Sequence, residues 1–137
     1  MKLSMLSRCR PLVFVAAALA VPAAQALTAA ELLTAYTAQA GTTPSPERGQ
    51  RFFTTNFGRE LGWSCSTCHG SNPTKPGKDD VSDKKIGPLA PAFNAERFTD
   101  RVKVENAFRL NCKDVVGREC SAAEKADLMS WLLSFKP

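Results

Sequence analysis

The string Cys-Ser-Thr-Cys-His at residues 65–69 constrains this chain more than any other feature of its sequence. Two cysteines separated by two residues and followed at once by a histidine form the attachment sequence of a c-type haem. In that chemistry the two thiols become thioethers on the haem vinyl groups, and the adjacent histidine is an axial ligand of the iron. We therefore expect one haem c, attached covalently through Cys65 and Cys68, with His69 on the iron.

Two other uses of the same string are less favoured by its surroundings. A thiol–disulfide motif is typical of a strand–helix context in a βαβ unit, and no such pattern surrounds residues 65–69. A structural zinc site needs four ligands, and the only other candidates here are cysteines for which a disulfide is expected. A haem site is the favoured interpretation.

The first 26 residues have the features of a secretory signal. Three cations (Lys2, Arg8 and Arg10) precede an uncharged apolar stretch at residues 12–21, and Ala-Gln-Ala at residues 24–26 is typical of a cleavage site. Cleavage after Ala26 predicts export to the periplasm and one small domain at residues 27–137. The apolar stretch is too short to span a bilayer, so we expect no stable membrane insertion, although a retained anchor is the alternative.

Export also predicts the state of the remaining cysteines. Of the five in the chain, Cys9 lies in the signal and two lie in the haem motif, which leaves Cys112 and Cys120. In an oxidising compartment, two cysteines so close in sequence are expected to form a disulfide. The alternative is a pair of buried free thiols.

The charge balance gives no case for a nucleic-acid partner. The formal net charge is +5, and loss of the three cations in the signal lowers it to +2. Two ionised haem propionates would bring the total near zero, so no strong cationic field remains. Residues 75–85 contain both lysines and aspartates, which favours a solvated loop over a docking patch for a redox partner.

The pattern of caps and apolar positions predicts an all-α chain. Capping boxes at Thr28–Glu31 and Ser121–Glu124 begin the first and last helices. Further helices are expected after Ser45, at the haem motif, and from a Thr99 cap to about Leu110. Proline and glycine predict a loop at residues 70–92, and residues 113–120 are expected to form a second loop. No segment alternates with the period of a strand.

The residues alone do not decide what occupies the second axial position of the iron. His69 is the only histidine, and the methionines are Met1, Met5 and Met129. Met129 lies within the last apolar helix, where filling the core is the more frequent role. Lysines are numerous, but their ammonium groups are usually solvated at neutral pH.

Two neighbouring residues remain as candidates. Cys112 could offer a thiolate, but a disulfide with Cys120 would remove it. Asn111 is expected at the end of its helix, where asparagine more often caps the helix than binds a metal. Spacing alone therefore leaves the sixth ligand open.

A resemblance to a known family bears on this question. The segments that carry it are residues 109–120 (Arg-Leu-Asn-Cys-Lys-Asp-Val-Val-Gly-Arg-Glu-Cys), 124–128, 131–132, 47–49 (Glu-Arg-Gly), 86–91 (Ile-Gly-Pro-Leu-Ala-Pro) and 97–100 (Arg-Phe-Thr-Asp). Together they closely resemble the sphaeroides haem protein family, which comprises class I c-type cytochromes with a high-spin haem. The Asn-Cys pair and the Gly-Arg-acidic-Cys run are its most specific parts.

The resemblance implies a class I cytochrome c fold with an additional N-terminal helix, as well as several site residues. It implies that the side-chain oxygen of Asn111 binds ferric iron and leaves on reduction, and that a Cys112–Cys120 disulfide fixes the loop holding Asn111. It also implies that the Pro88 carbonyl accepts the Nδ1–H of His69, which orients the ring.

The function expected from these features is one-electron transfer by a monomeric periplasmic monohaem cytochrome whose ferrous form binds O2, NO or CO. The resemblance implies a dihaem cytochrome c, or another redox protein, as electron donor. Alternatives are an ordinary carrier with a saturated iron, a terminal oxidase or reductase acting on small molecules, and a gas-binding module. The sequence leaves open whether any oxygen or nitrogen-oxide reductase activity accompanies electron transfer.

Overall fold

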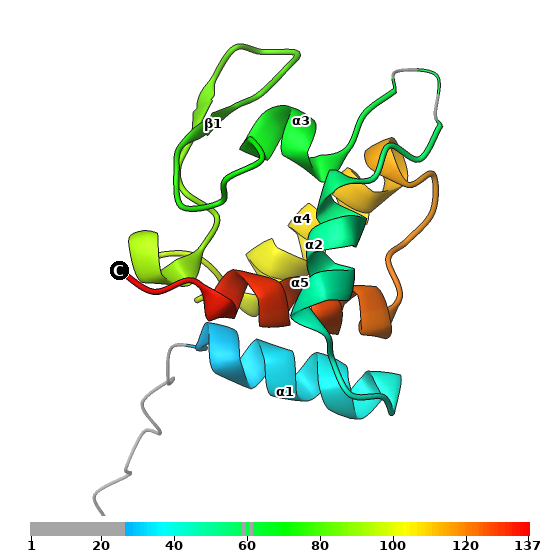
Figure 1. Cartoon of the computed structure of the whole chain (residues 1–137), viewed down its shortest axis with the longest axis vertical. Coiled ribbons are helices and arrows are strands. Elements are labelled where there is room, and N and C mark those ends of the chain that lie inside the picture. The colour runs from blue at the N-terminus through cyan, green and yellow to red at the C-terminus, as the bar shows by residue number, and fades with distance from the viewer. Residues whose placement is uncertain (1–26, 59, 61) are drawn as a thin grey trace, which may run out of the picture.

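The computed structural model describes residues 27–58, 60 and 62–137, so the predicted signal at residues 1–26 lies outside the described residues. Its elements, in chain order, are α1 (Ala29–Ala40), α2 (Pro46–Thr54), α3 (Cys65–His69), β1 (Gly77–Lys78), β2 (Lys85–Ile86), the 3-10 turn η1 (Pro91–Phe93), α4 (Arg101–Val115) and α5 (Ala122–Ser134) (Figure 1). The predicted all-α class is confirmed. Among the described residues, no helix has the length and apolar character needed to cross a membrane.

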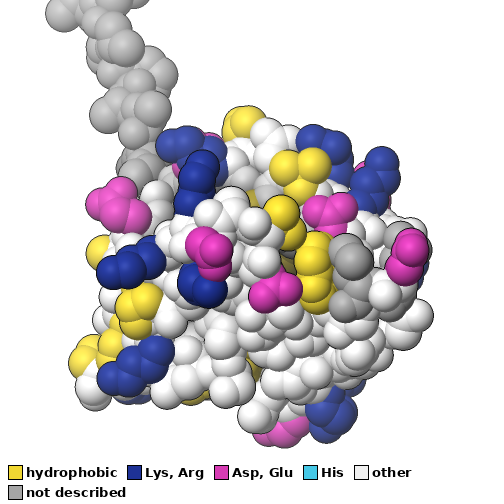
Figure 2. All heavy atoms as spheres, turned by 90° about the horizontal axis from the view of Figure 1, so that it is seen from above, with side chains coloured by type: hydrophobic (Ala, Val, Ile, Leu, Met, Phe, Trp, Pro, Cys, Tyr) yellow, Lys and Arg dark blue, Asp and Glu magenta, His cyan; other side chains and the backbone are white. Residues whose placement is uncertain are grey.

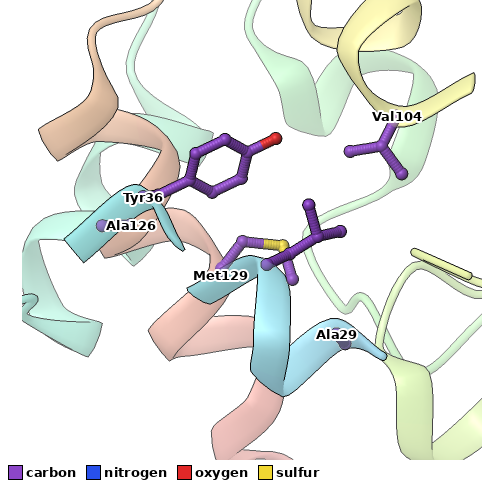
Figure 3. Packing of buried hydrophobic residues seen from close by; sticks show 6 residues of the cluster. Ala29, Tyr36, Val104, Ala126 and Met129 are labelled. Atoms are coloured by element: carbon purple, nitrogen blue, oxygen red, sulfur yellow. The ribbon is translucent and has the colours of Figure 1, made fainter. Parts of the chain in front are cut away.

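Helix α5 is the centre of the packing. Helix α1 lies along one side of it, and α2 crosses it on another side (Figure 1). One hydrophobic cluster joins α1, α4 and α5 through Leu32, Tyr36, Val104 and Met129 (Figure 3). A second cluster joins α2 and α5 through four side chains, Phe53, Leu128, Trp131 and Leu132. The additional N-terminal helix therefore has its own apolar contact with the final helix.

The predicted helix starts at Thr28, Ser45 and Ser121 are confirmed. Each side-chain oxygen accepts the backbone N–H three residues later, at 3.2 Å in all three cases. At both capping boxes the glutamate also accepts the cap residue's own N–H. These bonds satisfy amide groups that a helix start otherwise leaves without partners.

The helix predicted from Thr99 to Leu110 is longer and begins later. Asp100 is its N-cap, with its carboxylate accepting the Lys103 N–H at 3.1 Å, and the helix continues to Val115. It ends where Gly117 adopts a φ of +83° and donates to the Cys112 carbonyl. Asn111 is therefore inside α4 and is not a helix cap, because nothing before Gly117 interrupts the helix.

A short hairpin replaces part of the predicted loop at residues 70–92. Gly77 pairs with Ile86 and Lys78 with Lys85 in antiparallel register. A strand of two residues is too short to show a period of two, which is why the sequence pattern missed it. Gly77 also lies against α3, and a side-chain carbon there would stand 2.8 Å from the His69 Cα. The hairpin thus packs on the segment that carries the haem motif.

Candidate haem site

A cavity of about 520 Å³ lies between α3, α4 and α5. Its size is within the usual range for small-molecule and cofactor sites. The predicted site residues that line it are Cys65, Cys68, His69, Asn111 and Cys112, whereas Pro88 and Cys120 do not. The fold therefore brings the haem motif and Asn111 to one cavity although His69 and Asn111 are 42 positions apart in the sequence.

The haem motif is held in a single turn of helix. Ser64 precedes the turn, donates its N–H to the Thr67 Oγ1 at 3.0 Å, and accepts the Thr67 N–H through its carbonyl at 3.1 Å. Residues 65, 68 and 69 are spaced three and four apart, so their side chains share one face of the turn. That face is the one that lines the cavity.

The two motif cysteines are partly buried and form no disulfide. Burial raises the pKa of the Cys65 thiol to about 11. A thiol–disulfide enzyme needs a lowered cysteine pKa, so this environment does not support that use of the motif. Nor do three or more His, Cys, Asp or Glu side chains gather as a metal site anywhere in the described part of the chain.

The environment of His69 fits an axial iron ligand. Burial lowers the pKa of its imidazole, and the positive charge of Arg97 lowers it further. The neutral imidazole thus favoured is the form that binds metals. Its Nδ1 is buried and has no hydrogen-bond partner among the described residues. This neutral imidazole lines the cavity beside the thiols of Cys65 and Cys68, so the donor set fits a haem c at this site.

The expected role of Pro88 is not realised in this structure. Its carbonyl accepts two other hydrogen bonds, from Asn94 Nδ2 at 3.2 Å and from Arg97 Nε at 3.0 Å. A carbonyl oxygen has two lone pairs, and these donors use both. His69 Nδ1 is consequently left without the predicted acceptor.

Asn111 lies on the cavity side of α4, together with Phe108 and Val115. These three positions are spaced three and four residues apart, which places them on one face of the helix. The next residue, Cys112, is bonded to Cys120 with their Cα atoms 5.6 Å apart. This disulfide ties the last turns of α4 to the segment that leads into α5, so Asn111 is held by a helix and not by a loop.

Met129 lies away from the cavity. Its side chain is completely buried between α1 and α5, in the cluster that contains Tyr36 and Val104 (Figure 3). The prediction that Met129 fills the core is confirmed.

Sequence reasoning assigned no role to two charged residues that line the cavity, Arg97 and Asp114. Asp114 follows Asn111 by three residues, and that spacing on a helix was the available signal. It was missed because the helix was expected to end before residue 114. Arg97 comes from the segment before α4, where only the folded chain shows which side chains face the cavity.

Comparison with known proteins adds an independent line of support. Residues 39–132 match a sequence family described as "Domain of unknown function (DUF1924)". The cytochrome c-type protein SHP of Cereibacter sphaeroides is 42% identical over 123 residues, which cover 88% of this chain and 95% of that protein. The chain belongs to the SHP family. A second relative, cytochrome c'' of Methylophilus methylotrophus, is 43% identical over 95 residues and is matched over 65% of its length.

Solved structures of these two relatives have the same fold as this chain. Oxidised SHP, described as an oxygen-binding cytochrome c, superposes with a TM-score of 0.75 at 39% identity, covering 80% of this chain and 99% of SHP. A solution structure of cytochrome c'', concerned with haem-ligand detachment, gives 0.69 at 38% identity and covers 80% of this chain and 94% of that protein. The class I cytochrome c fold predicted for this chain is thereby confirmed.

Proposed function

We propose that this protein is a periplasmic monohaem c-type cytochrome that transfers one electron and binds O2, NO or CO in its ferrous form. The observation that carries the proposal is the shared cavity, which is lined by both His69 and Asn111. The alternative ligand Met129 is buried elsewhere, and the chain has no second histidine. Asn111 is therefore the best available side chain for the second axial position.

The proposed roles follow from the chemistry of each donor. Cys65 and Cys68 hold one haem covalently, and His69 binds its iron throughout. When bound, the haem would supply a one-electron couple. The side-chain oxygen of Asn111 is a hard, neutral and weak donor, which suits ferric iron better than ferrous iron. Asn111 would therefore hold ferric iron more readily than ferrous iron, and in the reduced protein its place would be accessible to a diatomic ligand.

Two relatives support this account. SHP is described as an oxygen-binding cytochrome c, and the solution structure of cytochrome c'' concerns haem-ligand detachment. We carry both properties over to this chain as part of the proposal. The partner we propose is a dihaem cytochrome c donor, with the protein acting as a monomer after export and cleavage at Ala26. On the face in Figure 2, Lys and Arg side chains are interspersed with Asp and Glu side chains. A surface of mixed charge is better suited to transient contact with a redox protein than to binding a polyanion.

A second candidate function is reduction of the bound small molecule. It is favoured by Asp114, an exposed residue that lines the same cavity one helical turn after Asn111. Asp114 would be the candidate proton donor that reductase chemistry requires.

The substitution Asn111→Val tests the proposal. Valine removes the oxygen donor at similar size, so the ferric absorption spectrum should change and CO should bind the ferrous protein faster. The matched control is Asn106→Val, which makes the same change at an exposed position on α4 that does not line the cavity. A ferric spectrum identical in wild type and Asn111→Val would exclude Asn111 as the ligand.

A further inference from the structure

Arg97 is a partly buried cation without an acidic partner. Its side chain lines the haem cavity, donates from Nε to the Pro88 carbonyl at 3.0 Å, and donates from Nη2 to the Gly87 carbonyl at 2.8 Å. Neither acceptor carries a charge, and Arg97 belongs to none of the ion pairs found among the described residues. Burial alone lowers the pKa of its guanidinium.

The other charged groups at the cavity are already accounted for or solvated. The Asp79 carboxylate accepts hydrogen bonds from Val81 and Ser82 in the hairpin turn. Asp100 caps α4 and lies 3.4 Å from the Lys103 ammonium. Glu96 and Asp114 also line the cavity, but both are exposed and neither pairs with Arg97. No protein carboxylate among the described residues neutralises this guanidinium.

A cation withdrawn from water is unfavourable unless an anion balances it. Guanidinium has five N–H donors in a planar fork that matches a carboxylate, and the two bonds to backbone carbonyls do not use Nη1. Those two bonds also fix the direction of the side chain. Arg97 is therefore held in place with Nη1 left for an acceptor that is not among the described residues.

We propose that Arg97 is the counter-ion of a haem propionate. The inference rests on the haem site proposed above, because a haem c brings two carboxylates into this cavity. Arg97 is a positioning residue in this account, since it binds the edge of the haem and holds the Gly87 and Pro88 carbonyls at the same time. Its removal would leave a propionate without its balancing charge near the iron, and an uncompensated negative charge favours the ferric state.

The test measures the redox equilibrium of the purified holoprotein in three variants. Arg97→Gln removes the charge, and Arg97→Lys keeps it with fewer donors. Arg101→Gln removes an exposed charge four residues later, outside the cavity. At an ambient potential where wild type is half reduced, the ferrous-to-ferric ratio should fall about tenfold in Arg97→Gln, as expected for one charge within ~10 Å at an effective dielectric near 20. The ratio should fall less in Arg97→Lys and stay unchanged in Arg101→Gln.

A purely structural role would give a different pattern. If Arg97 only holds the two carbonyls, lysine and glutamine would both lower the melting temperature, and neither would shift the ratio beyond the Arg101→Gln control. That result overturns the proposal. If Arg97→Gln does not fold, an experimental structure of the wild-type holoprotein tests the proposed contact between Arg97 and a propionate. Both propionates more than 4 Å from the guanidinium would contradict the inference.

The same preparation separates this inference from the proposed function. If the wild-type protein carries no covalent haem after denaturing electrophoresis, both the proposed function and the role of Arg97 are refuted. Wild-type protein with covalent haem and CO binding, combined with an unshifted Arg97→Gln, would refute the role of Arg97 alone.

Discussion

Gly49 of α2 lies directly against the backbone of Asp127 of α5. A side-chain carbon at residue 49 would overlap the Asp127 carbonyl and stand 2.9 Å from the Leu128 nitrogen. The Asp127 carboxylate also links α5 to the start of α2. It accepts hydrogen bonds from the Ser45 N–H and from Nε and Nη2 of Arg48, each at 2.7 Å. This close contact places the next turn of α2 against the cavity.

Replacing Gly49 with alanine should therefore destabilise the protein. The overlapping atoms belong to the backbone of α5, so the two helices must separate, and overpacking of this kind costs about 1–3 kcal/mol. Phe53 follows Gly49 by one turn, packs on Trp131 with ring centroids 5.0 Å apart, and would move with α2. Urea unfolding of the holoprotein measures the loss.

The control for this substitution is Gln50→Ala on the exposed side of the same helix. It should change the free energy of unfolding by less than about 0.5 kcal/mol. Equal stability of the Gly49→Ala and Gln50→Ala proteins would show that α2 and α5 are not in close contact.

Loss of the Cys112–Cys120 disulfide should loosen the helix that carries Asn111. The bond closes a segment in which the cysteines are 8 residues apart. A loop of that length predicts a loss of about 2–3 kcal/mol in Cys112→Ser or Cys120→Ser. Thermal unfolding and the rate of CO binding should both change, and added reductant should reproduce the effect in wild type. Insensitivity of wild type to reductant would argue that the disulfide does not form.

The substitution Met129→Leu should leave the haem spectra unchanged. Met129 is completely buried in the cluster with Leu32 and Tyr36, outside the cavity. Leucine has a similar volume, so the stability change should be below about 1.5 kcal/mol. A change in the ferric or ferrous absorption bands would show that Met129 binds the iron after rearrangement of α5.

The Arg118–Glu124 pair predicts a stability difference that depends on pH. Hydrogen bonds from Arg118, at 2.6 and 2.9 Å, hold the pKa of Glu124 below its usual 4.5. A lowered folded-state pKa stabilises the protein above the unfolded-state pKa, and this contribution is lost as the pH falls through the folded-state pKa. The pair is partly exposed, so the difference between wild type and Glu124→Gln should be at most about 1 kcal/mol at pH 7.

Unfolding curves between pH 7 and pH 3 check this expectation. The advantage of wild type over Glu124→Gln should shrink as the pH falls below about 4.5. Glu119→Gln, at an exposed position, is the matched control. An advantage of wild type that grows toward acid pH would contradict the sign of the assignment.

Features set by local chemistry could be predicted from the sequence. The caps at Thr28, Ser45 and Ser121 depend on residues three positions apart, and the helical turn at residues 65–69 depends on its own bonds. Each of these patterns lies within a few residues, so tertiary contacts had little influence on it. The burial of Met129 in the core could be predicted because apolar residues surround it within a single helix.

Features set by distant contacts could not be predicted in this way. Helix α4 continues past Asn111 because Cys112 and Val115 are buried against the rest of the fold, which outweighs the tendency of asparagine to end a helix. The Pro88 carbonyl is taken by donors from Asn94 and Arg97, and the sequence gives no rule for that competition. The position of Arg97 in the cavity depends on the same tertiary arrangement.

The most direct test of the account is the absorption spectrum of the purified wild-type protein in its ferric form, its ferrous form, and its ferrous form with CO. A weak Asn111 ligand predicts high-spin bands in both oxidation states and a large, rapid shift on addition of CO. Sharp low-spin bands that do not respond to CO would contradict the account, because they would require a strong ligand in the position assigned to Asn111.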